Sequence, residues 1–176
     1  MSYAPLSHDN YLVYRYWLKG LLGEPPEDVD MSSVAAFRAN YHEKVAINTG
    51  YLVPNGTIRL EVLGFHDLPL ADEAMESAKR LVREGMEQGA VGFSTGSSYY
   101  PGPWSSTDDL VEICEVVRDG DGVYMCEPRR ANPERAFGGG GVAEGLEIAR
   151  RSGVKLHFAH LRTEPKTAGH VEELMH

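Results

Sequence analysis

The stretches GAVGFSTGSSYYPG, residues 89–102, and LHFAHLR, residues 156–162, decide how this chain is expected to fold. Each contains a short apolar run, typical of a buried β-strand, that ends in polar side chains. In α/β barrels the strands hold the backbone rigid and present functional side chains at their carboxyl ends. Both stretches therefore indicate an α/β barrel with its functional residues at the strand ends.

Glycines open three of the expected strands at a nearly constant spacing. Gly89, Gly122 and Gly153 are 33 and 31 residues apart, which suits one strand plus one helix. Short apolar strands that alternate with amphipathic helices predict a parallel sheet covered by helices. We expect about four such βα units, which is half of a TIM-type barrel of eight.

The other elements are expected from apolar spacing, chain breakers and capping residues. Near the N-terminus, one helix is expected over residues 10–22 and another begins after Ser32 or Ser33. Strands are expected over residues 45–49, 90–94, 122–126 and 154–159, with a loop over 53–56. Helices are expected from about residue 72, after Ser106 or Thr107, over 142–151 and over 167–175.

The length suits a single domain. The 176 residues, of which 42% are apolar, are enough to bury one core. A complete barrel of eight units usually needs about 250 residues, so a partial barrel is expected. We therefore interpret residues 1–176 as one partial barrel domain, with a helical segment over 1–43 and the βα units over 44–176.

Charge and cysteine content exclude several classes of partner. The chain has 17 basic and 26 acidic residues, a formal net charge of −9, and no basic stripe, so neither nucleic acid nor membrane is an expected partner. Two cysteines make no disulfide framework, and no apolar leader or membrane-length run is seen. A cytoplasmic protein is expected.

His160 follows an apolar strand, at the place where a barrel opens. A neutral imidazole there can bind a metal ion or a substrate. The alternative is a histidine whose hydrogen bonds are satisfied at a strand end. The two-residue alternation of a strand predicts that His157 lies on the opposite face, in a structural role.

Two more polar groups follow strands. Cys126 and Glu127 end the strand over 122–126, and a thiolate or a carboxylate can ligate zinc. A solvated glutamate before a proline is the alternative. Tyr99 and Tyr100 lie in a Gly/Pro/Ser loop directly after a strand, a place that often carries function. Ordinary loop packing is the alternative for the tyrosines.

The run GGGGVA, residues 138–143, formally matches the GxGxxG/A pattern of dinucleotide-binding sites. That pattern must follow a strand directly. Here about a dozen residues separate the run from Cys126, among them Pro128 and Pro133. The spacing favours a flexible linker, and a nucleotide-binding module is the alternative.

Four segments, in this order, resemble the amidohydrolase superfamily, and within it the N-acyl-D-amino-acid deacylases (D-aminoacylases). YLVPNGTIRL, residues 51–60, is similar to the family's LVPHGxxRL, with Asn55 where histidine is common. Residues 89–102 are similar to its GAxGxSTGLxYxPG. Residues 122–124 open the segment that reads GxYxTHxR in the family, and residues 158–162 are similar to ISHLK.

The resemblance implies roles for single residues. His160 corresponds to a ligand of the catalytic zinc, and Glu127 stands where the family has a second histidine ligand, as a surrogate for it. Tyr99 and Arg162 correspond to substrate contacts, and an arginine can hold a carboxylate in bidentate fashion. The family's remaining ligands and its catalytic aspartate correspond to positions before Met1 and beyond His176.

The reaction implied by the resemblance is hydrolysis of the linear amide of an N-acyl-D-amino acid. In that family chemistry, metal-bound hydroxide attacks the acyl carbonyl and releases a carboxylate and a D-amino acid. The alternative function is that of a non-catalytic truncated barrel that acts through self-association or partner binding. A half barrel favours such association because it exposes strand edges and apolar helix flanks.

Overall fold

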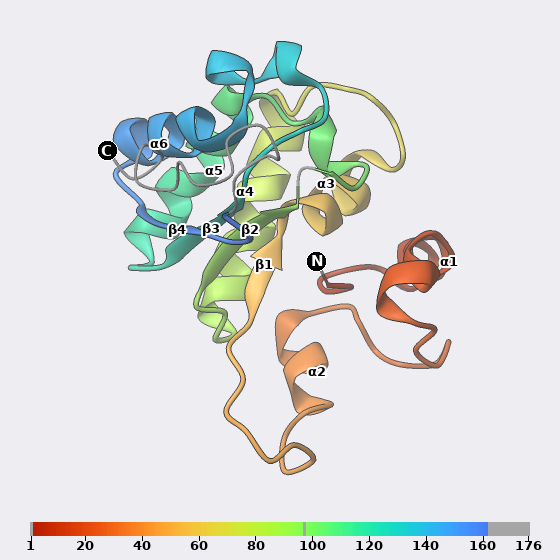
Figure 1. Ribbon diagram of the computed structural model, residues 1–176. Helices are drawn as coiled ribbons and strands as arrows, with labels where there is room; N and C mark the ends of the chain where they lie inside the picture. The colour runs from red at the N-terminus through yellow and green to blue at the C-terminus, as the bar shows by residue number, and fades with distance from the viewer. Residues whose placement is uncertain (1, 97, 162–176) are drawn as a thin grey trace.

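The computed structural model describes residues 2–96 and 98–161, and its centre is one parallel sheet of four strands (Figure 1). The strands are β1 (Leu52–Pro54), β2 (Gly92–Gly96), β3 (Val123–Glu127) and β4 (Lys155–Phe158). They lie side by side in chain order, β1-β2-β3-β4, and every neighbouring pair is parallel. This arrangement confirms the expected α/β fold with a parallel sheet.

Helices α4 (Asp72–Glu87), α5 (Thr107–Asp119) and α6 (Gly141–Ser152) pack against one another and against the sheet. Ser106 caps α5 with a capping box: its Oγ accepts from Asp109 N at 3.1 Å, and its N donates to the Asp109 carboxylate at 3.0 Å. The structure thus selects Ser106 from the two capping residues that the sequence allowed.

The main core lies between the sheet and these three helices. Phe93 and Tyr124 stack with ring centroids 6.2 Å apart, and the hydroxyl groups of Thr95 and Tyr124 are 2.9 Å apart. Because side chains alternate along a strand, the residues between these positions face the other way. On β2 and β3, Ser94 and Met125 therefore lie on the face without these helices.

The N-terminal segment forms a second layer beyond β1 (Figure 1). It contains α1 (His8–Leu22) and α2 (Val34–Ala39), which begins at a cap made by Ser33, whose Oγ accepts from Ala36 N at 3.0 Å. Both helices were expected. A smaller core joins this segment to α3 (Asn55–Leu63); its buried residues are Tyr3, Leu6, Tyr11, Tyr14, Leu18, Met31 and Leu60.

The prediction of a strand over residues 45–49 is wrong. Residues 41–50 are exposed and contain no strand, whereas β1 begins at Leu52 and α3 begins at Asn55, inside the expected loop. Strand preference largely reflects packing against neighbouring strands. In the described part of the chain β1 pairs through Leu52–Pro54 with β2, and no strand lies beside residues 45–49.

The helix expected over residues 167–175 lies outside the described residues. Among the helices of the described part, none combines the length and the apolar character needed to cross a membrane.

Candidate functional site

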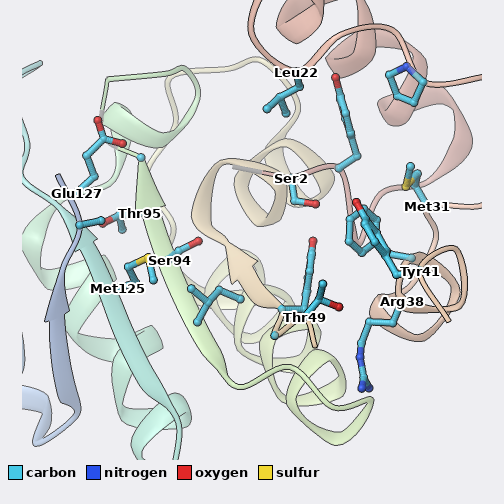
Figure 2. A pocket seen from close by; sticks show the side chains of 18 of the residues that line it. Ser2, Leu22, Met31, Arg38, Tyr41, Thr49, Ser94, Thr95, Met125 and Glu127 are labelled. Carbon is cyan, nitrogen blue, oxygen red and sulfur yellow. The ribbon is translucent and has the colours of Figure 1, made fainter. Parts of the chain in front are cut away.

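A cavity of about 570 Å³ lies between the sheet and the N-terminal segment (Figure 2). One wall is formed by the ends of the strands and the residues after β4: Leu52, Ser94, Thr95, Gly96, Met125, Glu127, Ala159 and His160. The other wall comes from the N-terminal segment: Ser2, Tyr3, Leu22, Pro25, Met31, Phe37, Arg38 and Tyr41. The cavity is therefore built by segments far apart in the sequence.

Two of the predicted site residues, Glu127 and His160, line this one cavity. Glu127 is the last residue of β3 and is half-buried, and His160 lies two residues beyond the end of β4 and is exposed. Since β3 and β4 are adjacent and parallel, their carboxyl ends open at the same edge of the sheet. A carboxylate and an imidazole thus face a shared space.

The backbone conformation at His160 explains why its side chain does not lie on the face that the two-residue alternation of a strand would give it. β4 ends at Phe158, and His160 has φ 54, in the left-handed region that few residues other than glycine adopt. His157 pairs with Met125 in the register of the sheet and so shares the face of Met125, which lines the cavity. The prediction that His157 lies on the opposite face is therefore wrong; its side chain is exposed.

The described residues do not complete a metal site. A zinc ion in a protein usually has three or four protein ligands. Within residues 2–96 and 98–161 there is no group of three or more His, Cys, Asp or Glu side chains placed to hold a metal ion. Glu127 and His160 are two donors, so a complete zinc site does not fit this part of the chain.

Cys126 is not a third donor, contrary to the possibility raised by its place at a strand end. It is buried on the helix-facing side of β3, where a Cβ atom added to Gly145 of α6 would lie 3.2 Å from its Sγ. The alternation of β3 turns Cys126 into the core and Glu127 toward the cavity. Of Cys126 and Glu127, the two possible ligands at the end of β3, Glu127 alone lines the cavity.

Both cysteines should resist thiol reagents in the folded protein. Burial raises the pKa of Cys126 and, more strongly, that of Cys114, so the thiolate fraction of each falls. At pH 8 we expect alkylation by iodoacetamide, followed by mass spectrometry, to be much slower in the native chain than in urea. Rapid native labelling of Cys126 would show that its thiol opens into the cavity.

Tyr99 lies in the turn that follows β2, at the same edge of the sheet as the cavity. Its N donates to the carbonyl of Gly96 at 3.1 Å, and its carbonyl accepts from Gly102 N at 3.0 Å. Tyr99 is half-buried and is not among the described residues that line the cavity. The other predicted substrate contact, Arg162, lies outside the described residues.

Arg129 is a residue that sequence reasoning missed. It lies two positions beyond β3 and is 3% exposed. Its guanidinium donates to the carbonyls of Pro103 and Ser105 and to the Glu144 carboxylate, each at 2.8 Å. Glu144 also accepts from the hydroxyl of Thr107 at 3.0 Å. Arg129 thereby joins the loop after β2 to the end of β3 and the start of α6.

The signal that could have identified Arg129 is its place directly after a strand end, the criterion that selected Glu127. Asn55, noted only as a departure from the family's histidine, has a similar structural task. It is buried at the start of α3, and its amide donates to Ser105 Oγ at 3.0 Å and to the Gly102 carbonyl at 3.3 Å. Both side chains hold the loop that carries Tyr99.

The glycine run belongs to the same region. Gly141 N donates to the Arg129 carbonyl at 3.2 Å, and a Cβ atom on Gly140 would lie 3.1 Å from that oxygen. Gly140 also has φ 98, which disfavours any other residue. The run thus lets the backbone close against Arg129. The run begins inside the 3₁₀ helix η3 (Phe137–Gly139), which comes after a second 3₁₀ helix, η2 (Pro133–Arg135). It therefore does not directly follow a strand, which argues against a dinucleotide site.

Comparison with known proteins finds deacylases that are similar to this chain in sequence. A D-aminoacylase from Alcaligenes xylosoxydans xylosoxydans is 27% identical over 139 residues, which cover 73% of this chain and 26% of that protein. An N-acyl-D-aspartate deacylase from the same organism is 27% identical over 141 residues, which cover 80% of this chain and 28% of that protein. The chain thus spans about a quarter of the length of these relatives. No protein-family model matches it.

Solved structures agree on the fold. A crystal structure of D-aminoacylase, an amidohydrolase, has a TM-score of 0.68 and 20% identity, covering 83% of this chain and 32% of that one. N-acyl-D-glutamate deacylase from Bordetella bronchiseptica, solved with zinc and a phosphonate mimic of the tetrahedral intermediate, has a TM-score of 0.72 and 24% identity, covering 89% and 33%. The four parallel strands and the helices between them therefore have the fold of part of an amidohydrolase barrel.

Proposed function

We propose that this chain, which resembles the N-acyl-D-amino-acid deacylases in sequence and in fold, forms the central part of a metal-dependent hydrolase for the linear amide of N-acyl-D-amino acids. Similarity to D-aminoacylase and its relatives supports an amidohydrolase-like function. The observation that carries the proposal is that Glu127 and His160 line one cavity at the carboxyl ends of adjacent strands.

The chemistry available to these two side chains suits an amide substrate. An imidazole nitrogen and a carboxylate oxygen both bind zinc, and a metal ion held there would polarise the carbonyl of an amide. The cavity is also lined by the apolar side chains of Leu22, Met31 and Phe37, which suit an acyl group. Tyr99 and Arg162 are proposed, from the resemblance, to contact the rest of the substrate, Arg162 at its carboxylate.

Metal dependence is part of the proposal. The solved neighbours include a D-aminoacylase with a binuclear metal centre and the zinc-containing N-acyl-D-glutamate deacylase. In this chain we assign His160 and Glu127 as two zinc ligands. Because these two do not complete a site in the described residues, the other ligands must come from elsewhere in the protein.

The test compares N-acetyl-D-aspartate, N-acetyl-D-glutamate and N-acetyl-D-leucine with their L-enantiomers, in the presence of zinc. We expect the D-compounds, and not the L-compounds, to raise the melting temperature of the chain. His160→Ala should abolish this stabilisation, because it removes the imidazole from the cavity.

The matched control is His66→Ala, which removes an exposed imidazole that does not line the cavity. This variant should respond to the D-compounds like the parent chain. Equal responses to both enantiomers, or an unchanged response in His160→Ala, would contradict the proposed function.

A further inference from the structure

On the basis of the proposed function, we infer that the N-terminal wall of the cavity, formed by residues between Ser2 and Tyr41, selects N-acyl-D-amino acids with a large aromatic acyl group over the N-acetyl compounds. The two walls of the cavity differ in polarity, the space between them exceeds what an acetyl group needs, and hydrogen bonds fix the N-terminal wall. The N-terminal segment thus adds an acyl-binding subsite to the strand-end site.

The two walls of the cavity offer different kinds of contact. On the sheet side Ser94 and Glu127 line the cavity, together with His160 beyond the end of β4. On the N-terminal side the lining includes the apolar side chains of Leu22 and Met31. Figure 2 shows Ser94 and Glu127 on the side opposite Leu22 and Met31. A substrate that spans the cavity therefore meets polar groups at one end and apolar side chains at the other.

Two polar side chains of the N-terminal wall are already engaged within the protein. The guanidinium of Arg38 donates to the carbonyl of Gln88 at 2.7 Å, and the hydroxyl of Tyr3 donates to the carbonyl of Gly23 at 3.5 Å. A charged or hydroxylated acyl group would have to compete with these internal acceptors. This wall is thus better suited to an apolar acyl group than to a polar one.

Three aromatic rings line the cavity together. The ring centroid of Phe37 lies 5.1 Å from that of Tyr41 and 4.7 Å from that of Tyr51, within the range of favourable aromatic contacts. Tyr41 is 39% exposed, so part of its ring remains open to a ligand. A further aromatic ring can pack against this cluster, which favours an aromatic acyl group such as phenylacetyl.

The size of the cavity also favours a large acyl group. Its volume of about 570 Å³ lies in the range of pockets that enclose drug-sized ligands. An acetyl group carries a single methyl group beyond its carbonyl and would leave most of the N-terminal wall without contact. A phenylacetyl group adds a ring, and the apolar surface that it buries against this wall stabilises the complex in proportion to its area.

Hydrogen bonds hold the N-terminal wall in place before a ligand binds. The carbonyl of Ser2 accepts from Thr57 Oγ1 at 2.9 Å, which ties the wall to α3. The carbonyl of Pro25 accepts from Arg15 Nε at 2.6 Å, which ties it to α1. A wall that is already ordered loses little conformational entropy when a ligand binds, so its shape can discriminate between acyl groups.

Isothermal titration calorimetry of the full 176-residue chain in the presence of zinc tests the inference. We expect N-phenylacetyl-D-leucine to bind at least about tenfold more tightly than N-acetyl-D-leucine. Leu22→Ser removes apolar surface from the N-terminal wall and should reduce this preference at least about threefold. The matched control is Leu21→Ser, which changes the neighbouring leucine of α1; Leu21 is 52% exposed and is not among the described residues that line the cavity. It should keep the full preference.

The outcomes distinguish the acyl-binding subsite from the proposed function. Equal affinities for the two acyl groups would overturn the inference and leave the expected preference for D-compounds as it stands. Tighter binding of the phenylacetyl compound in both its D- and L-forms would support the subsite and contradict the proposed function. Binding of neither compound would overturn both. An equal loss of preference in Leu21→Ser and Leu22→Ser would also overturn the inference, because the acyl group would then lie outside the cavity.

Photolabelling tests where the acyl group binds. A benzophenone analogue of N-phenylacetyl-D-leucine forms a bond with nearby C–H groups on irradiation, and mass spectrometry of the digested chain then finds the labelled residue. We expect the label on Leu22 or Met31, and we expect excess N-phenylacetyl-D-leucine to prevent it. A label on Tyr16 or Trp17, which are 69% and 56% exposed on α1 and are not among the described residues that line the cavity, would overturn the inference.

Discussion

Arg129→Met is expected to lower the free energy of unfolding by about 3–5 kcal/mol, a large part of the stability of a domain of this size. The side chains of Arg129 and Glu144 are 1% and 3% exposed and form an ion pair at 2.8 Å. Methionine would leave the Glu144 carboxylate buried without its cation. It would also leave the carbonyls of Pro103 and Ser105 without a donor. Urea-induced unfolding followed by circular dichroism measures the loss.

Two further variants distinguish the effect of the Arg129 charge from the effect of its hydrogen-bond geometry. Arg129→Lys keeps the charge but cannot reach all three acceptors with a planar fork, so it should lose part of the stability. The double variant Arg129→Met/Glu144→Leu removes both charges and should be more stable than Arg129→Met alone. A loss below about 1 kcal/mol in Arg129→Met would mean that the pair is solvated, because exposed ion pairs contribute about that much or less.

Gly92→Ala is expected to cost about 3 kcal/mol, the upper end of what overpacking usually costs. Gly92 pairs with Val123 where β2 meets β3. A Cβ atom at Gly92 would overlap the carbonyl oxygen of Val123 and would lie 2.8 Å from its N. Because both contacts are with backbone atoms, the strands must separate to admit even one methyl group. Thermal unfolding of the variant and the parent chain measures the difference.

Gly20→Ala is the matched control, since it adds the same methyl group where no atom lies within 4 Å. Gly20 is inside α1, where alanine is favoured over glycine by up to about 1 kcal/mol, so this variant should be slightly more stable than the parent. Equal stability of Gly92→Ala and the parent would show that β2 and β3 do not approach as closely as the structure has them.

Local sequence patterns predicted most elements of the fold because those elements are encoded locally. The apolar faces of α4 and α5 repeat with the period of a helix, and Ser106 caps α5 from its own sequence neighbourhood. The expected strand over residues 45–49 failed for the opposite reason. Its β-branched residues suit a strand, but pairing needs a neighbour, and the described chain supplies one only from Leu52 onward.

The residues of the candidate site were likewise predictable only in part. Strand-end position and family resemblance predicted Glu127 and His160, and both line the cavity. The wall formed by Tyr3, Leu22 and Met31 could not be predicted, because no periodicity relates the N-terminal segment to the strand ends. The partners of Arg129 lie 24 and 26 residues before it, and a hydrogen bond over that distance leaves no local pattern.

The sequence by itself determined the fold class of this protein. The spacing of strands and helices, the residues at strand ends and the motifs around them predicted parallel βα units that resemble part of a deacylase barrel, because each depends on short-range preferences. Only the tertiary structure decided which side chains share a space. Packing of the N-terminal segment across β1, the turn at His160 and the buried contacts of Arg129 join distant segments, and such contacts are selected by the energy of the whole fold.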